Sequence, residues 1–147
     1  MNIFEALRIS HVTQRALVDR LIQTQGDTRE RRAIVSSLQR ELAAHAAAEE
    51  RYFYLPLSAC SLLQQLAPEG LAGHQQMDQL MKALALADPR SPAWRLGAQA
   101  LHDQVHQHLE VEERSWFALA GTVLDAADLV SLALQYESEF VFQRVRA

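Results

Sequence analysis

Residues 45–51, HAAAEER, follow the same pattern as residues 108–114, HLEVEER. Both segments read H-x-x-x-E-E-R, and the second begins 63 residues after the first. The same offset relates His11 to His74, so each half of the chain has one histidine, a second histidine 34 residues later, and a glutamate four residues beyond that. The repeat predicts two similar helical hairpins that carry the same chemical groups at matching heights.

The scarce glycines and prolines cluster at four breaks, and apolar residues recur at helical spacing between the breaks. The pattern predicts helices over residues 3–24, from 27 or 28 to about 56, over 68–87, from 91 or 92 to about 120, and over 123–144, with a short apolar helix at 58–66. Asn2 and Glu5 have capping-box spacing, and Asp27 has Glu30 as a possible box partner. Pro56 should kink or end the second helix, since its nitrogen carries no proton.

Four long helices with short connections favour an all-α fold. We expect an up-down-up-down antiparallel four-helix bundle over about residues 3–120 and an additional C-terminal helix over about 123–144. The chain, residues 1–147, is interpreted as one domain, because its length fits a single core.

Composition excludes several classes of protein. With 49% hydrophobic and 22% charged residues, the chain is too apolar to be disordered and too charged for a membrane protein. The net charge is −4 and the arginines are scattered, so no nucleic-acid partner is expected. No uncharged stretch approaches the roughly 20 residues of a membrane span. The first residues do not resemble a signal peptide, so we expect a cytoplasmic protein.

The repeated residues are candidate metal ligands. They are His11, His45, Glu49, His74, His108 and Glu112. Each stands where the apolar period predicts a core position, and an isolated buried carboxylate costs several kcal/mol. Taken singly, a core histidine or an incidental i,i+4 pair would be an ordinary structural feature. The joint pattern favours two metal ions, because imidazole and carboxylate suit iron, manganese or zinc, and glutamates on different helices can bridge a metal pair.

Over about residues 5–120, the order H…HxxxE…H…HxxxE resembles the hemerythrin family, specifically its bacterial HHE cation-binding branch. The resemblance implies a four-helix bundle with two non-haem iron ions, oxo- or hydroxo-bridged, held by those six residues with both glutamates as bridges. It also implies binding of a small diatomic ligand, oxygen or nitric oxide. Where the oxygen-carrying hemerythrins have a further histidine on the third helix, this chain has Asp78. Asp78 could ligate, hold a water or be solvated.

Other interpretations remain open at this point. The chain could be a di-iron oxidase or peroxidase, or an interaction protein with a structural metal, and it could be a monomer or a homodimer formed through the C-terminal helix. Tyr52, one turn from Glu49, could reach the metal, although core packing is the favoured interpretation. His102 and His106, with Glu110 and Glu113, are interpreted as a solvated face, with a surface zinc site as the lesser alternative.

Overall fold

The computed structural model describes residues 1–146, and every regular element in that range is a helix. The elements are α1 (Ile3–Gln23), α2 (Arg29–Glu49), η1 (Glu50–Tyr54), α3 (Leu55–Ser58), η2 (Ser61–Leu63), α4 (Leu66–Leu86), α5 (Pro92–Val111), η3 (Glu112–Trp116), α6 (Phe117–Gly121) and α7 (Ala126–Arg146). The predicted all-α class with a C-terminal helix is confirmed.

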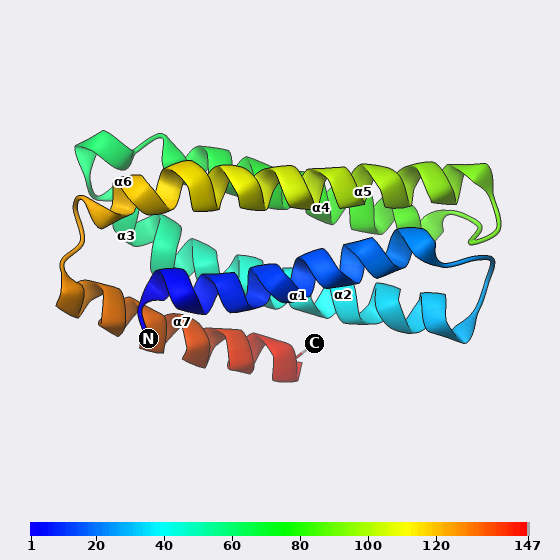
Figure 1. Cartoon of the computed structure of the whole chain (residues 1–147), viewed down its shortest axis with the longest axis horizontal. Coiled ribbons are helices and arrows are strands. Elements are labelled where there is room, and N and C mark those ends of the chain that lie inside the picture. Colours follow the sequence, from blue (N-terminus) through cyan, green and yellow to red (C-terminus); the bar gives the residue numbers. More distant parts are fainter. Residues whose placement is uncertain (147) are drawn as a thin grey trace.

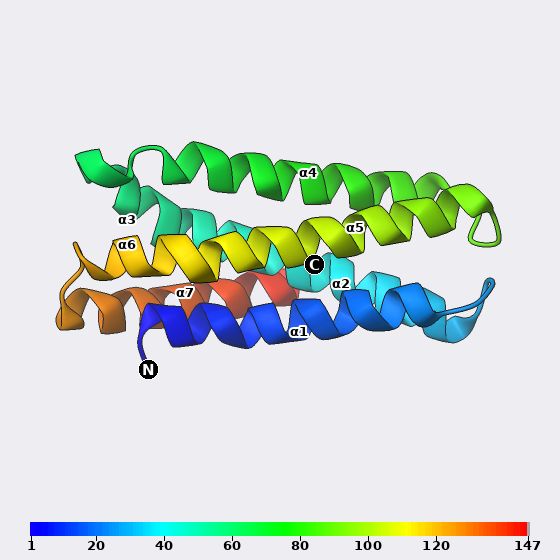
Figure 2. The same cartoon turned by 45° about the horizontal axis from the view of Figure 1, so that its top comes forward.

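The four long helices form two antiparallel hairpins that pack side by side (Figure 1). In the bundle, α1 packs against α2 and α5, while α4 packs against α5 and more lightly against α2. The C-terminal α7 turns back along the outside and lies against both α1 and α2 (Figure 2). One hairpin is therefore covered by an extra helix, and the other is not.

The helix starts follow the predicted capping chemistry, with one difference. Asn2 and Glu5 form a complete capping box, and the Ser91 side chain accepts a hydrogen bond from the Trp94 amide. At α2 the cap is Thr28, whose side chain accepts from the Arg31 amide. Asp27 instead forms an ion pair with Arg32, at 2.7 Å.

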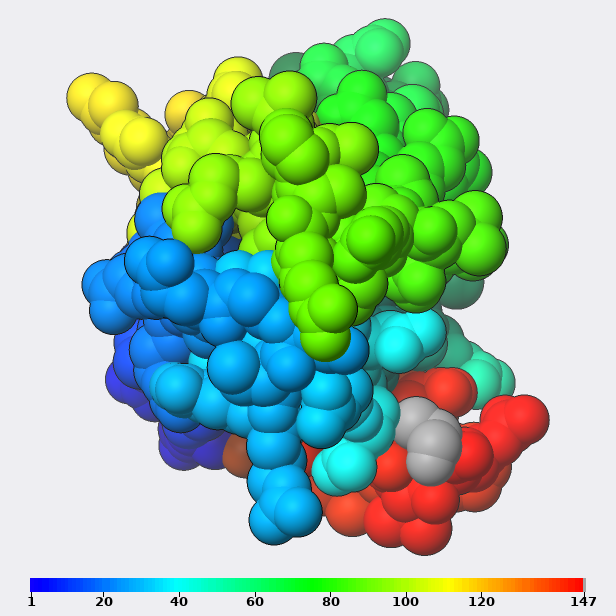
Figure 3. Space-filling model, turned by 90° about the vertical axis from the view of Figure 1, so that its right-hand side faces the viewer, coloured from blue at the N-terminus to red at the C-terminus, as the bar shows by residue number. Residues whose placement is uncertain are grey.

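The two inter-helix loops at one end of the bundle lie against each other (Figure 3). Buried Arg31 joins them, because its guanidinium donates to the Thr24 side chain and carbonyl and to the carbonyl of Pro89. The same guanidinium lies 3.7 Å from the centre of the Trp94 ring. This contact closes the end of the bundle and fixes the two hairpins relative to each other.

The segment that joins the two hairpins, from the end of α2 to the start of α4, differs from the prediction. The helix continues past Pro56 to Ser58, and the irregularity lies before the proline, where Glu50–Tyr54 form a π-helical turn. A second π-turn, Glu112–Trp116, occurs at the equivalent place with no proline nearby. The predicted apolar helix over 58–66 is wrong, because Cys60 has extended backbone angles and only the short 3₁₀ turn Ser61–Leu63 forms.

Two apolar clusters fill the bundle, one on each side of a buried polar layer. On α1 the first cluster includes Ile3 and Leu7 and the second includes Val18 and Leu21, with His11 between them. Met77, Met81, Phe53 and Trp116, which lie on either side of this layer, are all buried in these clusters. None of the helices in residues 1–146 is long and apolar enough to cross a bilayer.

Candidate metal centre

The buried polar layer consists of the six residues predicted from the repeat. They are His11 on α1, His45 and Glu49 on α2, His74 on α4, His108 on α5 and Glu112 at the start of η3. All six are at most 7% exposed. The structure thus brings every predicted site residue to one place, with the four bundle helices each contributing at least one imidazole or carboxylate.

The glutamates lie between the two pairs of histidines. Glu49 Oε2 is 3.2 Å from His45 Nε2 and 3.9 Å from His11 Nε2, whereas its Oε1 is 3.2 Å from His74 Nε2. Glu112 Oε1 is 3.1 Å from His11 Nε2, and its Oε2 is 3.6 Å from His108 Nε2. Each carboxylate therefore offers one oxygen to each pair of histidines, as a ligand that bridges two cations would.

Most of these atoms have no hydrogen-bond partner within the described chain. The unpaired buried atoms are His11 Nε2, His45 Nε2, His74 Nε2, both oxygens of Glu49 and Oε1 of Glu112. An unpaired buried polar atom costs about 1–3 kcal/mol, and more when it is charged. Six such atoms facing one another fit bound cations, because each would gain a metal ligand bond in place of the missing hydrogen bond.

Three of the four histidines are held through the other ring nitrogen. Nδ1 of His11 lies 2.8 Å from Glu113 Oε1, and Nδ1 of His74 lies 2.9 Å from Glu50 Oε1. These two glutamates are the second members of the repeated Glu-Glu pairs, and each holds the first histidine of the other hairpin. A donated Nδ1–H leaves the Nε2 lone pair free for a metal.

The third such contact comes from the C-terminal helix. Nδ1 of His45 lies 2.9 Å from the hydroxyl of Tyr136, which is 2% exposed on α7. Burial raises the pKa of Tyr136, so the phenol stays neutral and can accept this hydrogen bond. The role of Tyr136 was not predicted, since nothing in the repeat extends to α7.

The hydroxyl of Tyr54 also reaches the centre and was missed. It donates to Glu112 Oε2 at 2.5 Å and lies 3.4 Å from His108 Nε2. In a π-turn, residues five apart share a face, so Glu49 and Tyr54 point the same way. The α-helical spacing pointed instead to Tyr52, which is partly buried against the apolar cluster, as the favoured interpretation expected.

The aromatic rings beside the centre follow the repeat but differ in chemistry. Tyr54 stacks on His74, with ring centres 5.4 Å apart, and Phe117, 63 residues later, stacks on His11 at 6.0 Å. The two halves are thus equivalent in shape, but only one carries a hydroxyl. This difference makes the two halves of the centre chemically distinct.

The pKa values of the grouped carboxylates and imidazoles diverge. Burial and the nearby Glu49 charge raise the pKa of Glu112 to about 8. Burial would raise the pKa of Glu49 as well, but His45 and the other histidines hold it well below its ordinary value. Burial lowers the pKa of His108 to about 3; at His74 the hydrogen bonds to glutamate outweigh burial and raise it to about 9. The layer therefore holds extra protons that cations would displace.

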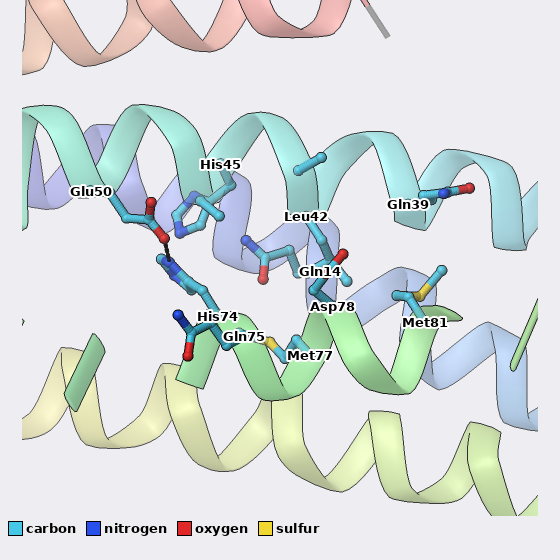
Figure 4. Close-up of a pocket in the computed structure, with 12 residues that line it drawn as sticks. Gln14, Gln39, Leu42, His45, Glu50, His74, Gln75, Met77, Asp78 and Met81 are labelled. Carbon is cyan, nitrogen blue, oxygen red and sulfur yellow. Dashed lines mark hydrogen bonds and ion pairs between the residues drawn. The ribbon is translucent and has the colours of Figure 1, made fainter. Parts of the chain in front are cut away.

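A pocket of about 280 Å³ leads from the surface to His45 and His74 (Figure 4). Its lining combines apolar Leu42, Met77 and Met81 with the buried amide of Gln14. Asp78 lies at this pocket, but its side chain is 61% exposed and pairs with Lys82 at 2.7 Å. Of the three roles considered for Asp78, the structure favours the solvated one.

His102 and His106 lie outside the centre, partly exposed and next to Asp19 of α1. Glu110 is exposed, as expected for a solvated face. Grouping Glu113 with that face was wrong, because its carboxylate turns inward to His11 and Arg15. The burial of His11 explains the difference, since its Nδ1 needs an acceptor there.

Comparison with known proteins agrees with this geometry. The family model for the hemerythrin HHE cation-binding domain matches residues 2–120. A crystal structure of a hemerythrin HHE cation-binding domain-containing protein from Mycobacterium kansasii superposes with a TM-score of 0.86, at 22% sequence identity, covering 99% of this chain and 89% of that one. None of the curated protein sequences matches. At that identity the structural likeness establishes the fold, and the family match establishes the class of site.

Proposed function

Because the chain belongs to the hemerythrin HHE cation-binding domain family, we propose that its buried centre holds two non-haem iron ions and binds a small diatomic ligand, oxygen or nitric oxide. One observation carries the proposal: Glu49 and Glu112 each present one oxygen to each pair of histidines. That arrangement supports two cations with shared carboxylates better than a single cation.

The ligand roles follow from the distances. His11 and His45 would hold one ion and His74 and His108 the other, with Glu49 and Glu112 between them. Manganese and zinc also bind imidazole and carboxylate, so the ligand types alone do not select iron. We assign iron because the proposed function requires metal ions that can transfer electrons to a bound ligand. When bound, two ferrous ions supply up to two electrons to an oxygen molecule.

The pocket at His45 and His74 supports a small ligand. Its lining combines apolar side chains, among them Met77, with polar side chains that include Gln14, Glu50 and Gln75. Gln14 is 1% exposed, and its Nε2 donates to Ser10 at 3.1 Å, which fixes the direction of its side chain. A pocket of about 280 Å³ has room for a diatomic molecule such as oxygen or nitric oxide and is at the small end of the volumes that hold larger organic ligands.

Peroxidase or oxidase chemistry is the second candidate, and Tyr54 favours it. The Tyr54 hydroxyl donates to Glu112, so an exchangeable phenolic proton lies in a buried place beside the proposed ligands. An enzyme that reduces oxygen or peroxide needs such protons. Stopped-flow mixing of the ferrous protein with oxygen distinguishes the two functions. A spectrum that reverts on removal of oxygen supports binding, and irreversible oxidation with peroxide consumption supports the enzyme.

Metal analysis tests the centre itself. Protein loaded anaerobically with iron and washed with a mild chelator should retain two iron ions per chain, and after exposure to air it should absorb in the near ultraviolet. His74→Ala and His108→Ala should each lower iron retention far more than His102→Ala or His106→Ala, which leave the buried layer intact. A stoichiometry of one or none, or equal losses in all four variants, contradicts the proposal.

A further inference from the structure

A second cluster of side chains that could ligate a metal lies at the surface, between α1 and α5. Its members are Asp19 on α1 and His102 and His106 on α5, and one ligand atom from each lies within 4.8 Å of the others. Asp19 is eight residues beyond His11 along α1, which corresponds to about 12 Å of helix. The cluster is therefore separate from the buried centre, and the repeat does not include it.

Both imidazoles point the same nitrogen at the same carboxylate oxygen. Nε2 of His102 is 3.0 Å from Asp19 Oδ1, and Nε2 of His106 is 2.8 Å from it. The two histidines are four residues apart on one helix, and their ring centres are 4.5 Å apart. Ligands at the usual zinc bond lengths of about 2.0–2.2 Å stand about 3.4 Å from one another in a tetrahedron, close to these separations.

A further carboxylate orients His102. Asp103 Oδ1 lies 2.9 Å from His102 Nδ1 and also accepts a hydrogen bond from Gln99 Nε2 at 2.9 Å. An Nδ1–H donated to Asp103 leaves the Nε2 lone pair directed at Asp19. Both ring nitrogens of His102 thus face carboxylate oxygens, so Nε2 must carry either a second proton or a metal ion. A histidine held by a carboxylate in this way is typical of metal sites.

From these contacts we propose that Asp19, His102 and His106 bind one divalent transition-metal ion, with zinc as the best-fitting ion. Asp19 and Asp103 together balance the charge of a divalent cation. The three side chains are 21–50% exposed, which leaves a coordination position open to water. The bound ion would join α1 to α5 at a place where no ligand of the buried centre lies.

Zinc titration of the full-length, iron-loaded protein tests this proposal. Zinc binding is measured by competition with a chromogenic chelator, and iron content is measured in the same samples. Wild-type protein should bind exactly one more zinc ion per chain than the double variant His102→Ala/His106→Ala, whatever the buried centre takes up. Asp103→Asn should weaken this zinc binding by about 10–100-fold. Gln107→Ala, an exposed change on the same helix, should leave it unchanged.

Long-range ¹H–¹⁵N spectra give a second, independent readout. In wild-type protein, zinc should shift the Nε2 resonances of His102 and His106 but not their Nδ1 resonances. The proposal fails if the double variant, shown to be folded by circular dichroism, binds as much zinc as wild type. It also fails if wild-type protein releases one iron ion for each zinc ion gained, because the zinc would then occupy the buried centre.

Discussion

Two glycines inside α4 allow the large side chains of the centre to take their places. A Cβ added to Gly73 would collide with the His108 ring, and one added to Gly70 would collide with the Tyr54 ring. Glycine inside a helix costs about 0.5–1 kcal/mol relative to alanine. Both glycines lie within the helix predicted over residues 68–87, which the structure shows as the continuous helix α4. The two glycines leave room for the Tyr54 and His108 rings, and no periodic pattern in the sequence reveals this role.

Gly73→Ala should therefore damage the centre. The added methyl group must displace His108, so we expect a loss of about 1–3 kcal/mol in the free energy of unfolding and a clear loss of bound iron. Urea denaturation and metal analysis measure the two effects. Gly97→Ala is the matched control, because its Cβ would meet only Leu84 Cδ1, at an ordinary 3.5 Å. That variant should be as stable as wild type or up to about 1 kcal/mol more stable. Equal behaviour of the two variants would refute the argument.

The two π-turns are the elements that complete the centre. One begins at Glu50 and the other at Glu112, and each adds one residue to a helical turn, so the aromatic residue five positions after the proposed bridging glutamate faces inward. The six candidate ligands could be predicted because five of them precede the turns and Glu112 is the first residue of its turn, so regular α-helical spacing still relates each glutamate to its histidine. Tyr54 could not be, because a local change of helical period leaves no sequence signal as clear as the four-residue period.

Substitution of the two tyrosines of the first π-turn separates their roles. Tyr54→Phe keeps the ring but removes the donor to Glu112, so iron affinity should fall by about tenfold while the melting temperature changes little. Tyr52→Phe is the control at α-helical spacing and should leave iron affinity unchanged. Competition with a chelator measures both affinities. If Tyr52→Phe has the larger effect, the π-turn does not direct Tyr54 to the centre as described.

At the scale of the whole molecule, the duplicated pattern is only approximately symmetric. Glu50 and Glu113 hold equivalent histidines across the two hairpins. Tyr136 of α7 holds His45, whereas the equivalent His108 packs against Gly73 instead. The apolar periodicity and the repeat predicted the bundle and the six candidate ligands, since both rest on local sequence patterns. These patterns could not predict the contact of Tyr136 with His45. They also could not predict that Glu50 and Glu113 each contact a histidine of the other hairpin, because such contacts depend on how distant segments pack.

The grouped charges make the stability of the chelator-treated protein depend on pH. The folded-state pKa values of His74, about 9, and Glu112, about 8, lie above the ordinary values of 6.5 and 4.5. The folded state therefore binds more protons than the unfolded state, and this contribution to stability disappears as pH rises through 8 and 9. The lowered pKa values of Glu49 and His108 change the stability only below about pH 6.5. They therefore do not offset the loss of stability between pH 6.5 and 9.

We therefore expect the melting temperature of the chelator-treated protein to fall between pH 6.5 and 9. Iron-loaded protein should show a smaller fall, because the ions favour the deprotonated ligands. Thermal denaturation followed by circular dichroism at several pH values measures both. A chelator-treated protein that gains stability over this range would contradict the assigned protonation states.

The contact between Glu113 and the histidine of the other hairpin bears on when the centre can form during synthesis. The first histidine, His11, donates its Nδ1–H to Glu113, which follows it by about two-thirds of the chain. A nascent polypeptide that ends before Glu112 has neither the second carboxylate nor the acceptor for His11. The complete set of candidate ligands, with the acceptor for His11, is therefore present only after almost the entire bundle has been synthesised.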